Sequence, residues 1–297
     1  MKFKTSFHSF SYQGQREYQQ DRRYPVADSS HDEHQHIFAV CDGMGGTEQG
    51  DVASTSVANT LARMHDALNG EFLLTPDALS ASLWQAYEQL DTDGKDIDTG
   101  TTLAMLWLHQ GGCAMVNMGD SRVYQFRKSK GIVYRSKDHS LVNDLVEAHA
   151  ITPEEALTHP RRNIITRCME PSTLNRKRDN ASAFFTADVR VGDCFLICSD
   201  GVVGEVSEKS LTDIILSDEQ LDNKLATIAA FCENADDNAT AILIEVETVT
   251  IEDSDEQRDN LKVEIEPKKP VTRQIESVAE RGETSNFLIR LFNKIFK

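Results

Sequence analysis

The feature that most constrains the fold is the order of apolar strands and helices along the chain. Two helices are expected between Gly50 and Leu90 and two more between Glu208 and Cys232. Strands occur in blocks between these helix pairs and do not alternate with single helices. This order predicts an α+β fold of antiparallel sheets with helices stacked outside. The expected strands, several apolar enough to be buried on both faces, are 36–41, 101–108, 112–118, 121–127, 131–136, 194–199 and 239–246.

The composition of the chain changes near residue 248. Residues 1–247 predict one catalytic-size domain, in which residues 138–170 interrupt the strands as a flap-like surface insert. Residues 248–270 are acidic and poor in large apolar side chains, which favours an extended linker. Residues 271–297 would form a separate C-terminal tail. Within the insert, Pro153 after Thr152 predicts a helix that begins with a threonine cap.

The tail ends in SNFLIRLFNKIFK, which has an amphipathic helical pattern. At 100° per residue, its large apolar side chains share one arc, and a basic face fills the other. Such a helix could lie in a membrane interface, occupy a partner's groove or fold back on its own domain. Docking to protein is the simpler interpretation, because the acidic body would be repelled by anionic lipid.

Bulk charge and cysteine usage exclude several classes of protein. The formal net charge of −17 argues against a nucleic-acid binder, which needs a basic face. The six cysteines are scattered with no CxxC pair, so they predict buried thiols in a reducing compartment. The N-terminal residues lack the continuous apolar stretch of a secretory signal, and no stretch approaches a membrane span. We therefore expect a cytoplasmic protein.

Four apolar strands each have an aspartate at one end. Asp42, Asp120 and Asp200 follow three of them, and Asp237 precedes the fourth. An Asp-Gly pair after a strand is by itself an ordinary turn. Taken together, however, carboxylates gathered at one mouth of a sandwich would repel one another unless a cation neutralised them. Oxygen ligands without any Cys or His ligand spacing favour Mg²⁺ or Mn²⁺ over Zn²⁺.

Six short motifs in a fixed order carry a more specific signal. They are REYQQD at 16–21, VCDGMGG at 40–46, GTT at 100–102, GDSR at 119–122, SDG at 199–201 and DNAT at 237–240. Together they resemble the motifs of the metal-dependent (type 2C, PPM) serine/threonine protein phosphatases, over about residues 8–247. The DGMGG form and the insert sequence resemble the bacterial branch in particular.

This resemblance implies an α-β-β-α sandwich of two antiparallel sheets with a two-metal centre at one end. Asp42 would bridge the two cations, and the Gly43 carbonyl would ligate one of them. Asp200 and Asp237 would complete the shell of the other cation, and Asp21 would hold metal-bound water. Two such cations lower the pKa of bound water towards about 7 and so make hydroxide available for attack on phosphorus.

The resemblance also assigns a phosphate ligand and a further cation site. Arg16 would bind the substrate phosphate, since a guanidinium presents two parallel donors to phosphate oxygens. Asp120 would hold an additional, weaker cation together with Asp200. The alternatives are a surface ion pair for Arg16 and a simple turn for Asp120.

Two positions depart from the family pattern. Gln19 stands where the bacterial motif usually has asparagine, which changes a hydrogen bond but removes no ligand. Met44 stands where animal relatives carry a histidine thought to protonate the leaving group, so the general acid is left open. Elsewhere, His31, His34 and His36 are interpreted as a solvated loop in preference to a metal site, and His139 and His159 as packing or capping residues.

The leading interpretation is a phosphoserine/phosphothreonine protein phosphatase that uses Mn²⁺ or Mg²⁺ and opposes a bacterial serine/threonine kinase. Its partners would be phosphorylated proteins and that kinase, with no nucleic acid. One alternative is a catalytically silent phosphoprotein-binding regulator of the same fold. The intact set of aspartates argues against it, because a protein without catalysis would be free to lose them. A phosphatase dedicated to one regulatory protein would share the chemistry and differ only in substrate.

Overall fold

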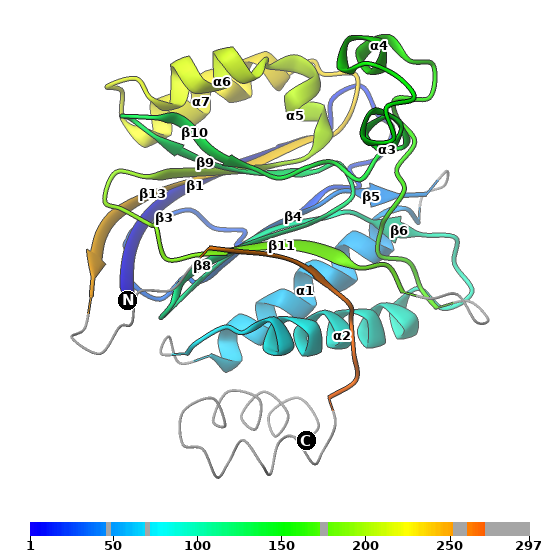
Figure 1. The fold of residues 1–297 in the computed structure, drawn as a ribbon, viewed down its shortest axis with the longest axis horizontal. Helices are drawn as coiled ribbons and strands as arrows, with labels where there is room; N and C mark the ends of the chain where they lie inside the picture. The colour runs from blue at the N-terminus through cyan, green and yellow to red at the C-terminus, as the bar shows by residue number, and fades with distance from the viewer. Residues whose placement is uncertain (46–48, 69–71, 173–177, 252–259, 271–297) are drawn as a thin grey trace.

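Two antiparallel sheets, each of six strands, form the centre of the molecule. The upper sheet, named from its place in Figure 1, has the strand order β10-β9-β12-β13-β1-β3. The computed structural model describes residues 1–45, 49–68, 72–172, 178–251 and 260–270. The upper strands are β1 (Lys2–Tyr12), β3 (Ser29–Asp32), β9 (Arg122–Arg127), β10 (Gly131–Arg135), β12 (Cys194–Cys198) and β13 (Ala239–Thr250).

The lower sheet has the strand order β14-β11-β8-β7-β4-β2. A separate two-stranded ribbon of β5 (Gly43–Met44) and β6 (Gly100–Thr101) stands at the end of the sandwich where β4 leads into it. The lower strands are β2 (Arg22–Tyr24), β4 (Ile37–Cys41), β7 (Leu103–His109), β8 (Gly112–Met118), β11 (Ala181–Thr186) and β14 (Leu261–Ile265).

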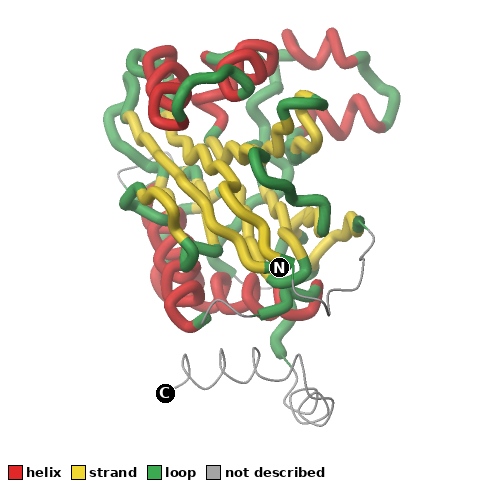
Figure 2. The backbone as a smooth tube through the Cα atoms, turned by 90° about the vertical axis from the view of Figure 1, so that its left-hand side faces the viewer, coloured by secondary structure: helices red, strands yellow, loops and turns green. Residues whose placement is uncertain are grey.

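Helices cover the outer face of each sheet, as Figures 1 and 2 show from two sides. Helices α1 (Asp51–Ala67) and α2 (Pro76–Asp93) lie under the lower sheet. The upper sheet is covered by α5 (Asp200–Glu205), α6 (Glu208–Ile215) and α7 (Leu221–Cys232). The predicted four-layer α-β-β-α arrangement is therefore confirmed. No helix in the described ranges is long and apolar enough to cross a membrane.

Three clusters of buried apolar side chains hold the four layers together. The middle cluster joins the facing sheets and includes Phe7, Phe38 and Phe195. A lower cluster packs α1 and α2 against the lower sheet around Trp107, and an upper cluster packs α5–α7 against Leu196 and its neighbours. Strands such as β7 and β8 are buried along their whole length because both faces meet a layer. This explains their nearly continuous apolar sequence.

The insert at residues 138–170 contains two short helices at the same end of the sandwich as β5 and β6. These are α3 (Leu141–Glu147) and α4 (Pro153–Thr158). The predicted cap of α4 is present: the Thr152 hydroxyl accepts from the backbone N–H of Glu155, and the Glu155 carboxylate accepts from that of Thr152. The insert is thus a folded excursion whose two ends return to the sheets.

The structure corrects the expected boundary of the domain at residue 248. Strand β13 continues to Thr250, and residues 261–265, which the acidic composition assigned to a linker, form β14 at the edge of the lower sheet. Lys262 and Glu264 alternate with Val263 and Ile265, so only one face of β14 is apolar. An edge strand needs no more than one buried face. The tail at 271–297, including its expected amphipathic helix, lies outside the described residues.

Candidate metal centre

Five aspartates from distant parts of the chain meet at one end of the sandwich. Asp42 and Asp120 follow strands β4 and β8 of the lower sheet. Asp200 follows β12, and Asp237 precedes β13, both in the upper sheet. Asp21 precedes β2. The side chain of Asp42 feels the charge of each of the other four, which shows that all five of the carboxylates predicted from sequence belong to one cluster.

Burial and mutual repulsion make Asp21, Asp42, Asp120 and Asp200 hard to ionise. Burial is the largest cause of the raised pKa in each of these four. It raises the pKa of Asp21 to about 7 and that of Asp120 to about 7, with the charge of Asp200 adding to both shifts. The pKa of Asp42 is raised well above its usual value, and that of Asp200 is also raised. A cluster of this kind stores repulsion that a bound cation would relieve.

Unsatisfied oxygens point to the same conclusion. One carboxylate oxygen each of Asp21, Asp120 and Asp200 is buried without a hydrogen-bond partner. A buried polar atom in this condition is costly unless something outside the protein ligates it. Oxygen-only donors of this kind suit a hard divalent cation such as Mg²⁺ or Mn²⁺.

The carboxylates are not, however, arranged as a ready-made ion cage. In the part of the chain that the structure describes, no three acidic, imidazole or thiol groups already stand as one ion site. Two of the needed oxygens have other partners: Asp237 Oδ2 accepts from Arg16 at 2.6 Å, and Asp21 Oδ2 accepts from the Ser199 hydroxyl at 2.8 Å. These two contacts can be exchanged for a cation by turning a carboxylate, whereas the bare buried oxygens of Asp21, Asp120 and Asp200 have no partner to exchange.

Arg16 stands at the mouth of the cluster, where its side chain is 60 % exposed. Its pKa is raised by the hydrogen bond and charge of Asp237, with Asp200 and Asp42 contributing further. The loop that carries it is held by Asn238, whose side-chain amide donates to the carbonyls of Gln13 and Tyr18 at 2.7 and 3.0 Å. The surface ion pair considered as an alternative for Arg16 is therefore present, and it is made with a member of the cluster.

Gly43 is placed where no side chain would fit. A Cβ atom there would lie 2.5 Å from the Gly50 carbonyl oxygen and 2.6 Å from that of Gln20. Only glycine at this position lets the backbone after Asp42 lie this close to the backbone of Gly50 and Gln20. Met44 follows in the same ribbon, and Gly46 of the motif lies outside the described residues.

Several residues that support the aspartates received no role from sequence reasoning. Ser199 donates to Asp21, and its Oγ accepts from the backbone N–H of Thr240 at 3.0 Å. Thr102 Oγ1 accepts from the Asp42 N–H at 3.0 Å, while the Thr102 N–H donates to the Asp42 carbonyl at 2.9 Å. Ser199 and Thr102 both lie within the recognised motifs, and their place in those motifs is the sequence signal that could have identified them. Gln19 also has a clear role: its Oε1 accepts from the Asp21 N–H at 2.9 Å.

Among the histidines considered from sequence, one expectation was wrong. His36 is buried rather than solvated, and burial together with His65 lowers its pKa to about 4. His31 is exposed, and its Nδ1 forms a contact of 2.5 Å with Glu247. Residues 29–32 form edge strand β3 rather than a loop. His139 is buried at the start of the insert and packs against β11 and the turn after β8.

Comparison with known proteins shows what this arrangement resembles. Residues 13–241 match the family model described as Protein phosphatase 2C. The chain is 33 % identical over 217 residues to protein phosphatase PhpP of Streptococcus pneumoniae, a match that covers 70 % of this chain and 85 % of that protein. It is 32 % identical over 222 residues to serine/threonine protein phosphatase PstP of Mycobacterium tuberculosis, covering 71 % of this chain and 40 % of PstP.

Solved structures give the same result in three dimensions. The serine/threonine phosphatase PstP/Ppp of Mycobacterium tuberculosis superposes with a TM-score of 0.68 at 27 % identity, covering 82 % of this chain and all of that one. The catalytic domain of PstP in complex with two manganese ions superposes with a TM-score of 0.67 at 25 % identity, covering 83 % of this chain and all of that one.

Proposed function

The chain belongs to the protein phosphatase 2C family and is a serine/threonine protein phosphatase of the metal-dependent kind, and from this we propose that the cluster of five aspartates is its catalytic centre. One observation carries this assignment. Asp21, Asp120 and Asp200, each with one buried oxygen that has no hydrogen-bond partner, gather around Asp42. When bound there, two divalent cations supply Lewis acidity and an activated water for hydrolysis of the phosphomonoester.

We propose that Mn²⁺ or Mg²⁺ is held by the residues that the resemblance assigned. Asp42 would be the shared ligand, since it feels the charge of every other carboxylate in the cluster. The Gly43 carbonyl, Asp200 and Asp237 would complete the ligand set. Asp21 would orient water, because one of its oxygens is fixed by Ser199 while the other is bare.

Asp120 is proposed as the ligand of a further, weaker cation. Asp120 is half-buried, has one buried unsatisfied oxygen and feels the charge of Asp200, with which it would share that cation. It stands on the turn after β8. A site built from fewer carboxylates binds a cation less tightly, so this position would fill only at higher metal concentration.

Arg16 is proposed to bind the phosphate of the substrate. Its ion pair with Asp237 holds the guanidinium at the mouth, and its exposure leaves it free to turn towards an arriving dianion. In doing so it would release Asp237 Oδ2 for the cation shell. Met44 has no proton to donate, so the leaving alkoxide must take its proton from water or from another group.

The substrates we propose are proteins phosphorylated on serine or threonine by a bacterial serine/threonine kinase. The central test is hydrolysis of a phosphothreonine peptide with Mn²⁺, compared with the same enzyme in excess EDTA. We expect phosphate release that depends on Mn²⁺ and is restored when the metal is added back. A protein that binds the phosphopeptide in Mn²⁺ but releases no phosphate would instead be the silent regulator of the same fold.

A further inference from the structure

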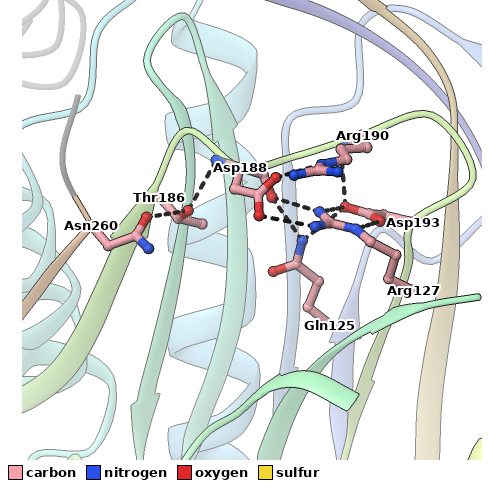
Figure 3. A network of polar contacts seen from close by, with 7 residues as sticks. All are labelled: Gln125, Arg127, Thr186, Asp188, Arg190, Asp193 and Asn260. Atoms are coloured by element: carbon pink, nitrogen blue, oxygen red, sulfur yellow. Dashed lines mark hydrogen bonds and ion pairs between the residues drawn. The ribbon is translucent and has the colours of Figure 1, made fainter. Parts of the chain in front are cut away.

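Strand β14 lies beyond residue 241, where the match to the family model ends. It pairs antiparallel with β11, from Ala181 opposite Ile265 to Phe185 opposite Leu261. Side chains tie it down at both ends. At the end shown in Figure 3, the Thr186 hydroxyl donates to Asn260 at 2.6 Å, beside the ion pairs of Arg127. After the strand, the Ser80 hydroxyl donates to the carbonyl of Glu266 at 2.5 Å.

A third link runs from β14 towards the metal centre. The Ser182 hydroxyl donates to Glu264 Oε1 at 2.5 Å. His139 Nε2 lies 2.9 Å from the same hydroxyl oxygen, and His139 Nδ1 accepts from the Gly119 N–H at 3.2 Å. An unbroken line of hydrogen bonds therefore joins the edge strand to the residue before Asp120.

The donor and acceptor roles along this line are fixed by its two ends. Glu264 is a carboxylate and can only accept, so the single Ser182 proton points to it. Ser182 must then accept a proton from His139 Nε2. The backbone N–H of Gly119 can only donate, so His139 Nδ1 must be bare. Both ends require the same neutral tautomer, and burial, which lowers the pKa of His139 to about 4, agrees with it.

His139 holds the turn at Gly119 from two sides. Besides the ring contact, the His139 N–H donates to the Gly119 carbonyl at 2.8 Å. Gly119 has φ +98°, and a Cβ there would lie 2.6 Å from Thr102 Cγ2, so the turn has little room to shift. Asp120 is the residue after Gly119, and one oxygen of its carboxylate has no hydrogen-bond partner. The direction in which that carboxylate points therefore depends on how the turn at Gly119 is held.

Glu264 also reaches the far end of the insert. Arg167 forms an ion pair with Glu264 Oε2, and the Thr166 N–H donates to the His139 carbonyl at 2.9 Å. Arg167 near the end of the insert thus contacts the Glu264 carboxylate directly, and His139 near its start reaches the same carboxylate through the Ser182 hydroxyl. Arg122 adds a two-pronged ion pair to Asp138 at 2.6 and 2.7 Å, which fixes the start of the insert to β9.

We propose that β14 is a working part of the phosphatase domain, in which Glu264, Ser182 and His139 are positioning residues for the turn that carries Asp120. This rests on the proposed function, specifically on Asp120 as ligand of the weaker cation. Loss of the line should leave the group around Asp42 intact and weaken only the cation that Asp120 holds. The effect would therefore appear in metal dependence rather than in substrate affinity.

The test compares three serine variants of the full chain. Ser182→Ala removes the hydroxyl that joins Glu264 to His139, and Ser182→Thr restores a hydroxyl at the same place. Ser80→Ala is the matched control, because it removes a hydroxyl that holds the same C-terminal segment without touching His139. Each is assayed with p-nitrophenyl phosphate across a Mn²⁺ titration, and tightly bound ions are counted by calorimetry.

We expect Ser182→Ala to raise the Mn²⁺ concentration for half-maximal turnover by about three- to tenfold, the range for loss of one hydrogen bond in a polar network. KM for the ester and the number of tight ions should stay as in the wild type. Ser182→Thr and Ser80→Ala should both keep the wild-type metal dependence. Wild-type behaviour of Ser182→Ala, or an equal effect of Ser80→Ala, would overturn the proposal.

A measurement on the metal-free protein tests the hydrogen-bond line separately from the proposed role of Asp120 as a metal ligand. Nitrogen chemical shifts of the His139 ring and of the Gly119 amide report the hydrogen-bond line without any catalysis. Both should move in Ser182→Ala and stay in Ser80→Ala; unmoved signals would refute the line itself. If the signals move but Asp120→Ala has the metal dependence of the wild type, the role of Asp120 is wrong while the hydrogen-bond line stands.

Discussion

Among the single residues, Asp42 is the carboxylate whose ionisation is most unfavourable in the metal-free protein, and a bound cation would remove that penalty. Desolvation within the cluster raises its pKa, and the charges of four other carboxylates raise it further. We predict that Asp42→Asn lowers turnover below about a tenth of the wild type at saturating Mn²⁺, because no neutral amide can bridge two cations. The same change should raise the melting temperature in metal-free buffer at pH 8, since it removes a buried charge. Turnover above that limit would show that Asp42 is not the shared ligand.

The raised pKa values also predict how the metal-free protein responds to pH. Asp21 and Asp120 have a pKa of about 7 in the folded protein, well above the value of about 4 for an exposed aspartate. Their protonation therefore favours the folded state below pH 4, and this contribution is lost as pH rises through 7. Between pH 8 and pH 5.5, the melting temperature in EDTA should rise on acidification. In saturating Mn²⁺ this rise should be smaller or absent, and a larger rise with metal would contradict the assignment.

The residues that sequence could not reach are those whose role depends on folded distance. Asp42, Asp200 and Asp237 could be named because each adjoins an apolar strand and falls within a recognised motif. Ser182 and Glu264 lie more than 80 positions apart, and neither has a motif around it. Their contact follows only from the register of β11 with β14. Local patterns carry no information about which strand will be the neighbour.

At the scale of elements, burial decided which strands could be predicted. Strands β4, β7, β8 and β12 are buried at every position, and their continuous apolar sequences predicted them. Strand β1 was missed because the first three aromatic residues of KFKTSFHSFSY are separated by two or three polar ones and show no period of two, although Phe3, Phe7 and Phe10 are buried. β11 and β14 were missed as well. Helix α5 was missed too, since its sequence DGVVGE contains two glycines and only one turn of apolar side chains.

Strand β14 and the tail should differ sharply in what their removal does. Deleting residues 271–297 removes no residue of the described fold, so turnover on p-nitrophenyl phosphate should stay within about twofold of the wild type. Deleting residues 260–297 also removes β14 and leaves β11 as an unpaired edge, which should lower both melting temperature and turnover at limiting Mn²⁺. Purified proteins of both lengths, assayed side by side, test this. Equal losses in the two would place an essential element in the tail.

For the molecule as a whole, the proposed metal centre would join the ends of the two sheets. Asp42 belongs to the lower sheet, and Asp200 and Asp237 belong to the upper one. Free ions at about 100 times their dissociation constant would add about 2.7 kcal/mol to stability. We therefore predict that EDTA lowers the melting temperature by roughly 5–10 °C for a domain of this size.

Hydrogen exchange tests at the level of single amides whether the cations link the two sheets. On metal removal, amides at the ends of β4 and β12 nearest the aspartates should lose protection together, while those at the opposite ends keep it. The Asp42→Asn variant serves as the control, since EDTA should change it little. A loss confined to one sheet would mean that the cations do not bridge the two.

The pairing of β1 with β13 has a consequence for how the enzyme is made in the cell. Tyr12 lies opposite Ala239, so the ribosome must add 227 further residues after β1 before the first residue of β13 has been synthesised. At a synthesis rate of about 5–20 residues per second, this delay lasts roughly 10–50 s. During that time the exposed edge of β1 is available to other nascent chains on the same messenger. The enzyme should therefore depend on ribosome-bound chaperones more than its finished stability would suggest.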